Sequence, residues 1–305
     1  MRSFTVDAGG PVHVADYGGA GQLMLLVHGL GGSHLTWSSV APRLARRHRV
    51  LAVDLPGFGR SPIAGRRATV AANLALLGDV IGHLADGPLV LGGNSMGGLL
   101  AIGMAAQRPG LIDALLLVDP ALPLPRRNWR GDPFVRGFVL AHAVPTLGRR
   151  RLTRRIGALG PERTVRDVLA LCTVDAGLVD PALVDALITL ETERMNGDDW
   201  HVAVYDAARS LLRILALRTH AQRWIRSVVA PTLLVHGRRD RVVPIAAAES
   251  AARSRPDWEF QVFDNVGHIP MMEVPGQFLD VVEHWLARLP GAGRAQDLRP
   301  VGSVA

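Results

Sequence analysis

The sequence contains no lysine, only one cysteine and few aromatic residues. All 34 basic residues counted toward its positive charge are therefore arginine, and they are scattered along the chain. Cys172 has no partner for an internal disulfide or a cysteine-based metal cluster, so we expect it to be a packing residue. Aromatic residues make up 5% of the chain, which argues against a surface that stacks nucleic-acid bases.

Long uncharged apolar runs are also missing. No stretch approaches the ~18 apolar residues that cross a bilayer, and residues 1–10 lack the basic start and apolar run of a secretory signal. We therefore expect a cytoplasmic protein. The net charge of +7 would usually suggest nucleic acid or an anionic membrane as a partner. Scattered arginines fit a GC-rich coding bias equally well, and we predict no nucleic-acid partner.

What is present is a large apolar fraction arranged in alternating segments. Hydrophobic residues make up 48% of the 305 residues, enough for one large α/β domain with an insertion, or for two domains. Apolar runs predict strands and amphipathic segments predict helices at the spacing of right-handed βαβ units. The expected strands are 4–7, 12–16, 23–27, 50–53, 89–91, 111–118, 232–235 and 259–263; the expected helices are 37–46, 69–84, 245–252 and 276–289.

The alternation breaks at about residues 121–221, which are predicted to be almost wholly helical. Asp180-Pro181 is typical of a helix start, and a second helix is expected from about Trp200. We predict a core of 1–120 and 222–290, a helical cap over 121–221, and a flexible tail over 291–305. The cap begins with the densest basic region of the chain: Arg126, Arg127, Arg130, Arg149, Arg150, Arg151, Arg154 and Arg155.

A glycine-rich turn follows the expected strand at 89–91. In Gly93-Asn94-Ser95-Met96-Gly97, flanking glycines leave room for a sharp turn that lifts the Ser95 hydroxyl clear of the sheet. The N-terminus of the next helix points backbone N–H groups at any anion that forms there. Ser95 is therefore a candidate nucleophile. The alternative is a serine that only caps the helix.

A serine hydroxyl needs a base and a group that orients the base. Asp240 and His268 each follow an expected strand, and the carboxyl ends of parallel strands share one edge of a sheet. Both can therefore reach Ser95, and the order Ser95, Asp240, His268 is that of an α/β sheet with a strand-to-helix elbow. Asp119, also at a strand end, could supply the acid instead.

Several segments together make the chain resemble the α/β-hydrolase family, roughly over residues 4–119 and 222–289. The matching segments are His28-Gly29-Leu30-Gly31-Gly32, Asp54-Leu55-Pro56-Gly57-Phe58-Gly59-Arg60-Ser61, the Ser95 elbow, His236-Gly237-Arg238-Arg239-Asp240 with Val243-Pro244, and Gly267-His268-Ile269-Pro270 with Glu273 and Pro275. The resemblance implies a mostly parallel eight-stranded sheet with helices on both faces and a helical cap insertion.

The resemblance also implies a role for each site residue. Ser95 is the nucleophile, His268 the base and Asp240 its partner, and the N–H groups of Leu30 and Met96 form the oxyanion hole. Gly29 and Trp37 are candidates to line the substrate pocket, although Trp37 fits ordinary packing as well. We expect His28 and His236 to hydrogen-bond backbone groups and Asp54 to fix its own loop. No carboxylate or cysteine stands at ligand spacing beside the histidines, so no metal or cofactor is predicted.

These features predict a serine hydrolase that cleaves a carboxylic ester with an apolar acyl group. A serine nucleophile argues against epoxide hydrolase and haloalkane dehalogenase chemistry. The elbow is also similar to that of carbon–carbon bond hydrolases acting on ring-fission diketones, but Ile269-Pro270 stands where they usually carry tryptophan. A receptor that keeps the triad is a third hypothesis. The arginine-rich start of the cap suggests contact with an anionic interface or an acidic substrate, or a solvated helix face.

Overall fold

The chain folds around one eight-stranded sheet. The computed structural model describes residues 1–125, 145–197 and 200–289, with backbone only for 145–157 and 200. Strand order is β1-β2-β4-β3-β5-β6-β7-β8, and only β2 runs antiparallel to its neighbours. The strands are β1 (Arg2–Asp7), β2 (Pro11–Gly18), β3 (Leu23–Val27), β4 (Arg49–Val53), β5 (Leu89–Asn94), β6 (Ile112–Val118), β7 (Thr232–Gly237) and β8 (Glu259–Phe263). The expected fold class is confirmed.

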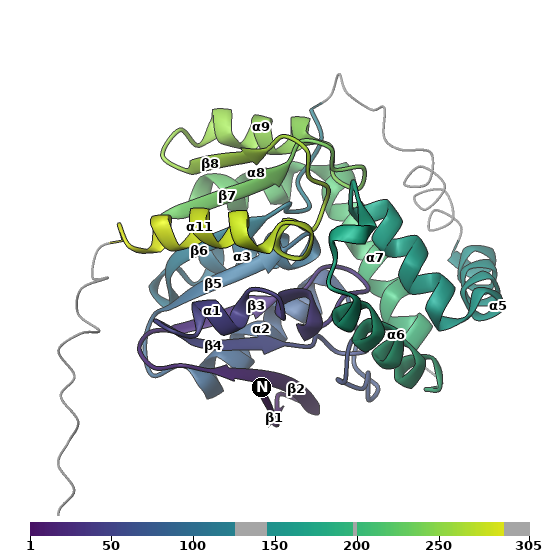
Figure 1. Ribbon diagram of the computed structural model, residues 1–305. Coiled ribbons are helices and arrows are strands. Elements are labelled where there is room, and N and C mark those ends of the chain that lie inside the picture. Colours follow the sequence, from purple (N-terminus) through teal and green to yellow (C-terminus); the bar gives the residue numbers. More distant parts are fainter. Residues whose placement is uncertain (126–144, 198–199, 290–305) are drawn as a thin grey trace, which may run out of the picture.

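Helices cover both faces of the sheet and one of its ends (Figure 1). The helices of the sheet layers are η1 (His34–Trp37), α1 (Ala41–Leu44), α2 (Val70–Leu84), α3 (Met96–Gln107), η2 (Pro109–Leu111), α8 (Thr219–Ser227), α9 (Ile245–Ser254), α10 (Pro270–Glu273) and α11 (Pro275–Leu286). Figure 1 shows α1 and α11 in front of the sheet and α2 and α3 behind it. The carboxyl ends of the parallel strands point toward the helices α5 (Pro145–Cys172), α6 (Pro181–Met195) and α7 (Trp200–Leu217) (Figure 1).

The alternation of side chains along the central strands divides the core in two. In β3, Leu25 and Val27 pack with α2 and α3, whereas Met24 and Leu26 pack with α1 and α11. Both pairs are fully buried. A strand covered on both faces must be apolar at every position, which is why the uninterrupted run at residues 23–27 identified β3 from sequence.

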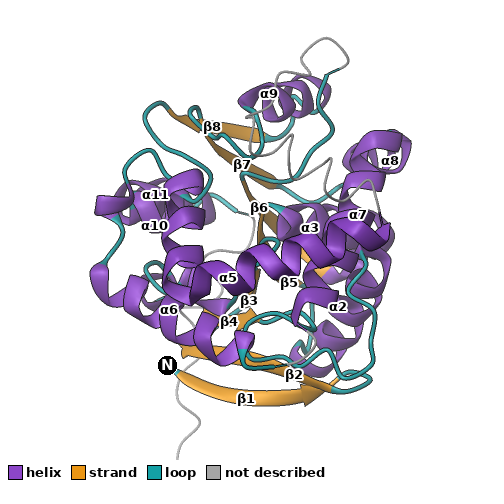
Figure 2. Ribbon diagram, turned by 90° about the vertical axis from the view of Figure 1, so that its right-hand side faces the viewer, coloured by secondary structure: helices purple, strands orange, loops and turns teal. Residues whose placement is uncertain are grey.

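All the described helices between β6 and β7 except α8 lie to one side of the sheet (Figures 1 and 2). They are α5 (Pro145–Cys172), η3 (Ala176–Leu178), α6 (Pro181–Met195) and α7 (Trp200–Leu217). α5 bends at Gly160, whose φ of 76° is left-handed and which precedes Pro161. The Asp180 side chain accepts the N–H of Ala182, so the expected helix start is confirmed. We call α5, η3, α6 and α7 the cap; the expected boundary at 221/222 falls within α8.

Helix boundaries agree with the sequence prediction in some places and differ from it in others. Thr69 accepts the N–H of Ala72, and α2 spans the expected residues. The helix expected over 37–46 is instead a 3₁₀ turn and the four-residue α1. Pro42 stands inside that span and lacks the N–H that a continuous helix would use. The helix expected over 276–289 is preceded by the separate α10 and ends at Leu286.

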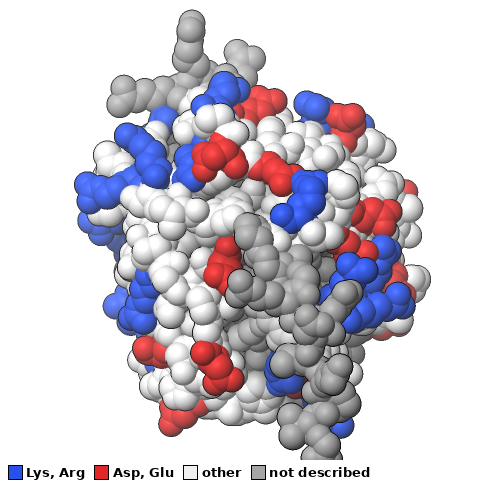
Figure 3. Space-filling model, turned by 90° about the vertical axis from the view of Figure 1, so that its left-hand side faces the viewer, with Lys and Arg blue, Asp and Glu red and all other residues white. Residues whose placement is uncertain are grey.

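Two surface properties bear on partners. Within the described ranges, none of the helices has the length and apolar character needed to cross a bilayer. On the side facing away from the cap, basic and acidic side chains alternate over the surface (Figure 3). Arg43 of α1 contacts both Asp280 and Glu283 of α11. The basic residues Arg126, Arg127 and Arg130 lie outside the described residues, so the hypothesis about the arginine-rich region stays a prediction.

Candidate active site

Ser95 sits at a sharp turn between β5 and α3. Its backbone has a φ of 53° and a ψ of −117°, a conformation that non-glycine residues adopt only where surrounding structure enforces it. A Cβ at Gly93 would lie 2.3 Å from the Gly97 carbonyl oxygen, and one at Gly97 would lie 2.3 Å from that of Val27. The two glycines are therefore required for the turn, as the sequence indicated.

The turn after β3 packs directly against this elbow. A Cβ at Gly29 would lie 2.9 Å from the Ser95 Cβ and 3.0 Å from Oδ1 of Asn94. Across the described parts of the chain, the backbone N–H groups of Leu30 and Met96 donate no hydrogen bond. Met96 is the first residue of α3, where helix geometry leaves N–H groups without an internal acceptor. Both N–H groups are therefore available for an anion beside Ser95.

His268 and Asp240 form a buried pair at the same edge of the sheet. His268 Nδ1 lies 2.6 Å from Oδ2 of Asp240. The other oxygen, Oδ1, accepts the N–H groups of Val242 and Val243 at 2.7 and 2.9 Å. Burial alone would raise the pKa of Asp240, but attraction to His268 and the hydrogen bond from it prevail and hold that pKa below its usual value. A charged Asp240 fixes the Nδ1–H tautomer of His268 and leaves Nε2 free to accept a proton.

The alternative acid, Asp119, lies next to this pair but is held differently. Its Oδ1 accepts the Gly237 N–H at 2.8 Å, whereas its buried Oδ2 has no hydrogen-bond partner among the described residues. Burial and the nearby charge of Asp240 raise the pKa of Asp119 well above its usual value. Between the two carboxyls, Asp240 is the one bonded to His268. His236 Nε2 lies 2.9 Å from the Val243 carbonyl, which is the backbone role expected for it.

Asn94 connects the Ser95 elbow to the His268 loop. Its side-chain amide donates to the carbonyls of Val118 and His268, each at 3.1 Å. This role is not predictable from the sequence, where Asn94 is only one residue of the turn motif. The bond places the backbone of His268 beside the residue that precedes Ser95.

The cap holds the His268 loop from the other side. The His268 N–H donates to the carbonyl of Cys172, the last residue of α5, at 2.6 Å. Glu273 accepts the N–H groups of Val174 and Asp175 through Oε1 and that of Gly267 through Oε2. One buried carboxylate thus joins the segment after α5 to the residue before His268. From the sequence, Glu273 is only part of a motif and Cys172 is expected only to be a packing residue.

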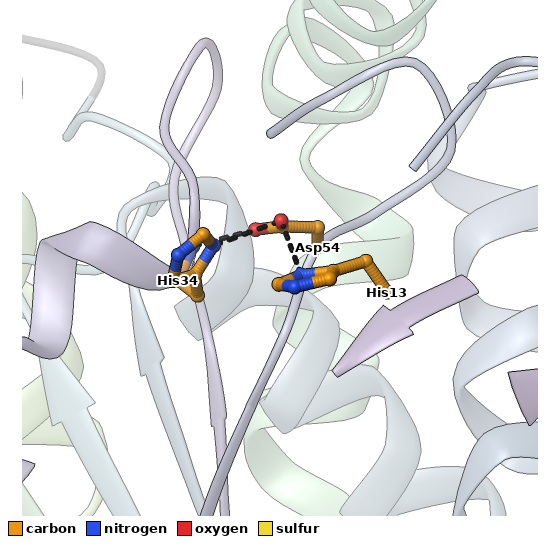
Figure 4. Close-up of side chains that lie close together, drawn as sticks. All are labelled: His13, His34 and Asp54. Atoms are coloured by element: carbon orange, nitrogen blue, oxygen red, sulfur yellow. Dashed lines mark hydrogen bonds and ion pairs between the residues drawn. The ribbon is translucent and has the colours of Figure 1, made fainter. Parts of the chain in front are cut away.

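A second polar cluster, His13, His34 and Asp54, lies under the same edge (Figure 4). Both imidazole Nδ1 atoms contact Oδ2 of Asp54, at 2.8 Å for His13 and 2.9 Å for His34. The N–H groups of His34 and Arg60 also donate to this carboxylate. Burial would raise the pKa of Asp54, but the hydrogen bonds from both histidines outweigh it, and the pKa lies well below its usual value. Asp54 therefore joins three segments, more than the single loop expected.

The same cluster is a candidate for a metal ion, because its ligand-type atoms lie within 4.8 Å of one another. Residue spacing in the sequence does not indicate that these three side chains are close together. However, Asp54 Oδ2 is already the acceptor of three N–H groups, and hydrogen bonds account for the arrangement. His28 is likewise held by backbone groups, since its Nε2 accepts the N–H of Leu55 at 3.0 Å, as expected.

Trp37, a candidate for the substrate pocket, is fully buried in the core on the α1 and α11 side of the sheet. These surroundings fit the alternative reading of ordinary packing, so we leave Trp37 out of the proposed site. Gly29, the other candidate, does abut Ser95.

Known proteins are similar to this chain over most of its length. A family model for the alpha/beta hydrolase fold matches residues 22–275. The chain is 29% identical over 296 residues to a 2-hydroxy-6-oxo-6-(2'-aminophenyl)hexa-2,4-dienoic acid hydrolase of Metapseudomonas resinovorans, covering 95% of this chain and 92% of that protein. It is 30% identical over 274 residues to a pimeloyl-[acyl-carrier protein] methyl ester esterase of Aeromonas hydrophila subsp. hydrophila, covering 88% and 96%.

Among solved structures, the chain is similar to a thermophilic esterase from Thermogutta terrifontis. The TM-score is 0.72 at 25% identity, over 95% of this chain and 99% of that one. Family model, relatives and fold lead to one conclusion. The chain belongs to the alpha/beta hydrolase fold family.

Proposed function

We propose that this protein is a serine hydrolase that cleaves carboxylic esters with an apolar acyl group through an acyl-enzyme intermediate. The observation that carries the proposal is the convergence of three loops on one sheet edge. Ser95 stands on a strained elbow, His268 is paired with Asp240, and Asn94 bonds the carbonyl of His268. Such an arrangement of an alcohol, an imidazole and a carboxylate is the one that acyl transfer requires.

In the proposed mechanism, the Ser95 hydroxyl attacks the ester carbonyl while Nε2 of His268 takes its proton. Asp240 stabilises the imidazolium that forms and keeps the ring oriented. The N–H groups of Leu30 and Met96 donate to the oxyanion of the tetrahedral intermediate. His268 then returns the proton to the leaving alcohol. Water, activated by His268, hydrolyses the acyl-enzyme and restores the Ser95 hydroxyl.

The similarity to a dienoic acid hydrolase supports a second candidate, hydrolysis of a carbon–carbon bond in a ring-fission diketone. The residues that follow His268 favour ester cleavage instead, since Ile269-Pro270 replaces the tryptophan usual in the carbon–carbon bond hydrolases. The similarity to a methyl ester esterase covers the chain to nearly the same extent. We therefore place ester hydrolysis first.

The test is turnover of p-nitrophenyl esters of increasing acyl length, measured beside turnover of a coloured ring-fission dienol. We expect ester hydrolysis that Ser95→Ala abolishes and that Ser227→Ala, at an exposed serine on α8, leaves unchanged. A fluorophosphonate should label the peptide that contains Ser95. Rapid fading of the dienol without ester turnover would establish the second candidate. If neither serine is labelled and the protein binds a ligand but turns over neither substrate, the receptor hypothesis would be supported.

A further inference from the structure

A groove lies between cap and core, on the face that α2 and α3 cover. Its floor is formed by Leu74 of α2, Met104 of α3, and Ile214 and Trp224 of α7 and α8. Figure 2 shows these four helices gathered together, and the groove has a volume of about 540 Å³. That volume falls within the roughly 300–1,000 Å³ typical of small-molecule sites. No residue of the proposed catalytic site lines it.

The floor of the groove offers apolar surface to solvent at the cap end. Leu217, the last residue of α7, lines the groove with 56% of its surface exposed. Leu74 and Met104 line the same groove and are buried. When a hydrocarbon chain covers an exposed aliphatic side chain such as Leu217, apolar surface is removed from water and the free energy falls.

The rim of the groove is basic. Arg108, Arg213 and His220 line it, and none of the described residues that line it carries a carboxylate. Over the described ranges, neither arginine forms an ion pair. By contrast, Arg67 on the neighbouring surface is paired with Asp206 at 2.6 Å. Guanidinium groups without a carboxylate partner beside an apolar surface are complementary to an anionic head on an apolar tail.

We propose that this groove binds one free long-chain carboxylate, with its tail on the floor and its head at the basic rim. The site is separate from Ser95, and the proposal does not rest on the proposed function. A ligand in this groove would contact helices of both the cap and the core. α7 passes into α8 at Arg218, whose φ of 58° is left-handed, so a ligand that contacts both helices together with α2 and α3 ties the end of the cap to the core.

The test uses a dodecanoate brominated at its terminal carbon, because bromine quenches tryptophan fluorescence only at close range and Trp224 lines the groove. With the full chain and monomeric ligand, we expect saturable quenching that Trp224→Phe largely removes. Arg213→Glu should weaken binding by about tenfold or more through lost charge complementarity. Arg209→Glu is the matched control, a charge reversal at an exposed arginine of α7 outside the groove, and should bind as the wild type does.

Four outcomes would overturn the proposal. Quenching that persists undiminished in Trp224→Phe would place the ligand elsewhere, including beside Ser95. Equal affinity of Arg213→Glu and Arg209→Glu for the dodecanoate would show that the ligand's carboxylate does not contact the basic rim. Equal affinity of the wild type for the dodecanoate and for the corresponding brominated dodecanol would show the same. Binding to anionic vesicles without any binding of the monomer would mark a membrane contact instead. Arg213 is exposed, so its variant tests the proposal even if Trp224→Phe does not fold. Ester turnover and Ser95 labelling, measured separately, report on the proposed function alone.

Discussion

The side-chain amide of Asn94 donates to the backbone carbonyl of His268 at 3.1 Å. This hydrogen bond joins two residues that are 174 positions apart in the chain. Asn94 directly precedes the candidate nucleophile, Ser95. The same amide also bonds Val118 at the end of β6. Replacing Asn94 therefore disturbs the positions of two neighbouring loops at once.

We expect Asn94→Asp to lower kcat about tenfold or more while KM changes little. A carboxylate has nearly the same shape but donates no N–H, so two buried carbonyls lose their donor and face a negative charge. Steady-state kinetics on a p-nitrophenyl ester measure the effect. If Asn94→Asp alters only KM, the bond to His268 does not position the base.

Asp240→Asn should reduce kcat by about 10³–10⁴-fold, because an amide holds His268 in the wrong tautomer and cannot stabilise the imidazolium. Asp119→Asn is the matched control and should keep kcat within about tenfold of the wild type. The opposite ranking of the two variants would assign the acid to Asp119.

Asp119→Asn should also change the dependence of stability on pH. A carboxyl whose folded pKa is raised stabilises the fold fully below its usual value of 3.8 and loses that contribution as pH rises through the folded pKa. Asparagine keeps an acceptor for Gly237 and carries no charge. We expect a Tm about 2–4 °C above the wild type near pH 8, with a smaller gain near pH 4. A loss of Tm that is equal at both values would contradict a raised pKa.

Gly29→Ala should lower kcat/KM by about tenfold or more, since its Cβ would meet Ser95 and Asn94 at about 3 Å. Gly110→Ala is the matched control, because a Cβ there meets nothing within 4 Å. Tm values of both variants separate loss of activity from loss of fold. Full activity of Gly29→Ala would show that the turn after β3 can move away from Ser95 without loss of catalysis.

Glu273→Gln should destabilise the protein by about 1–3 kcal/mol, because an NH₂ group then opposes the N–H of Gly267 or those of Val174 and Asp175. Denaturant unfolding measures the change. Faster hydrogen exchange at Val174 and Asp175 would identify the cap junction as the part released. Exchange rates equal to those of the wild type would refute that role for Glu273.

The parts of the fold and site that could be predicted from the sequence are those encoded by local patterns. Thr69 begins α2 because a threonine caps a helix within its own turn, and Gly93 and Gly97 are adjacent to the residue they accommodate. The order of strands then brings Asp240 and His268 to one edge. Their pairing followed from topology together with the resemblance to a family.

Contacts that neither a local pattern, the strand order nor the family resemblance implies could not be predicted. Nothing near His13 indicates that its imidazole reaches Asp54, and Glu273 gives no local sign that it holds Val174 and Asp175. The groove at Trp224 likewise combines helices from both sides of the insertion. These relationships depend on how loops pack, which residue spacing does not specify.

The hydrogen bond from the backbone N–H of His268 to the last carbonyl of α5 has a consequence for how substrate would enter. Lifting α5 away from the sheet breaks that bond and releases the backbone that aims the imidazole. In the proposed enzyme, substrate would then enter in one conformation and the proton would be transferred in another. While the cap is open, His268 would not be oriented to activate water.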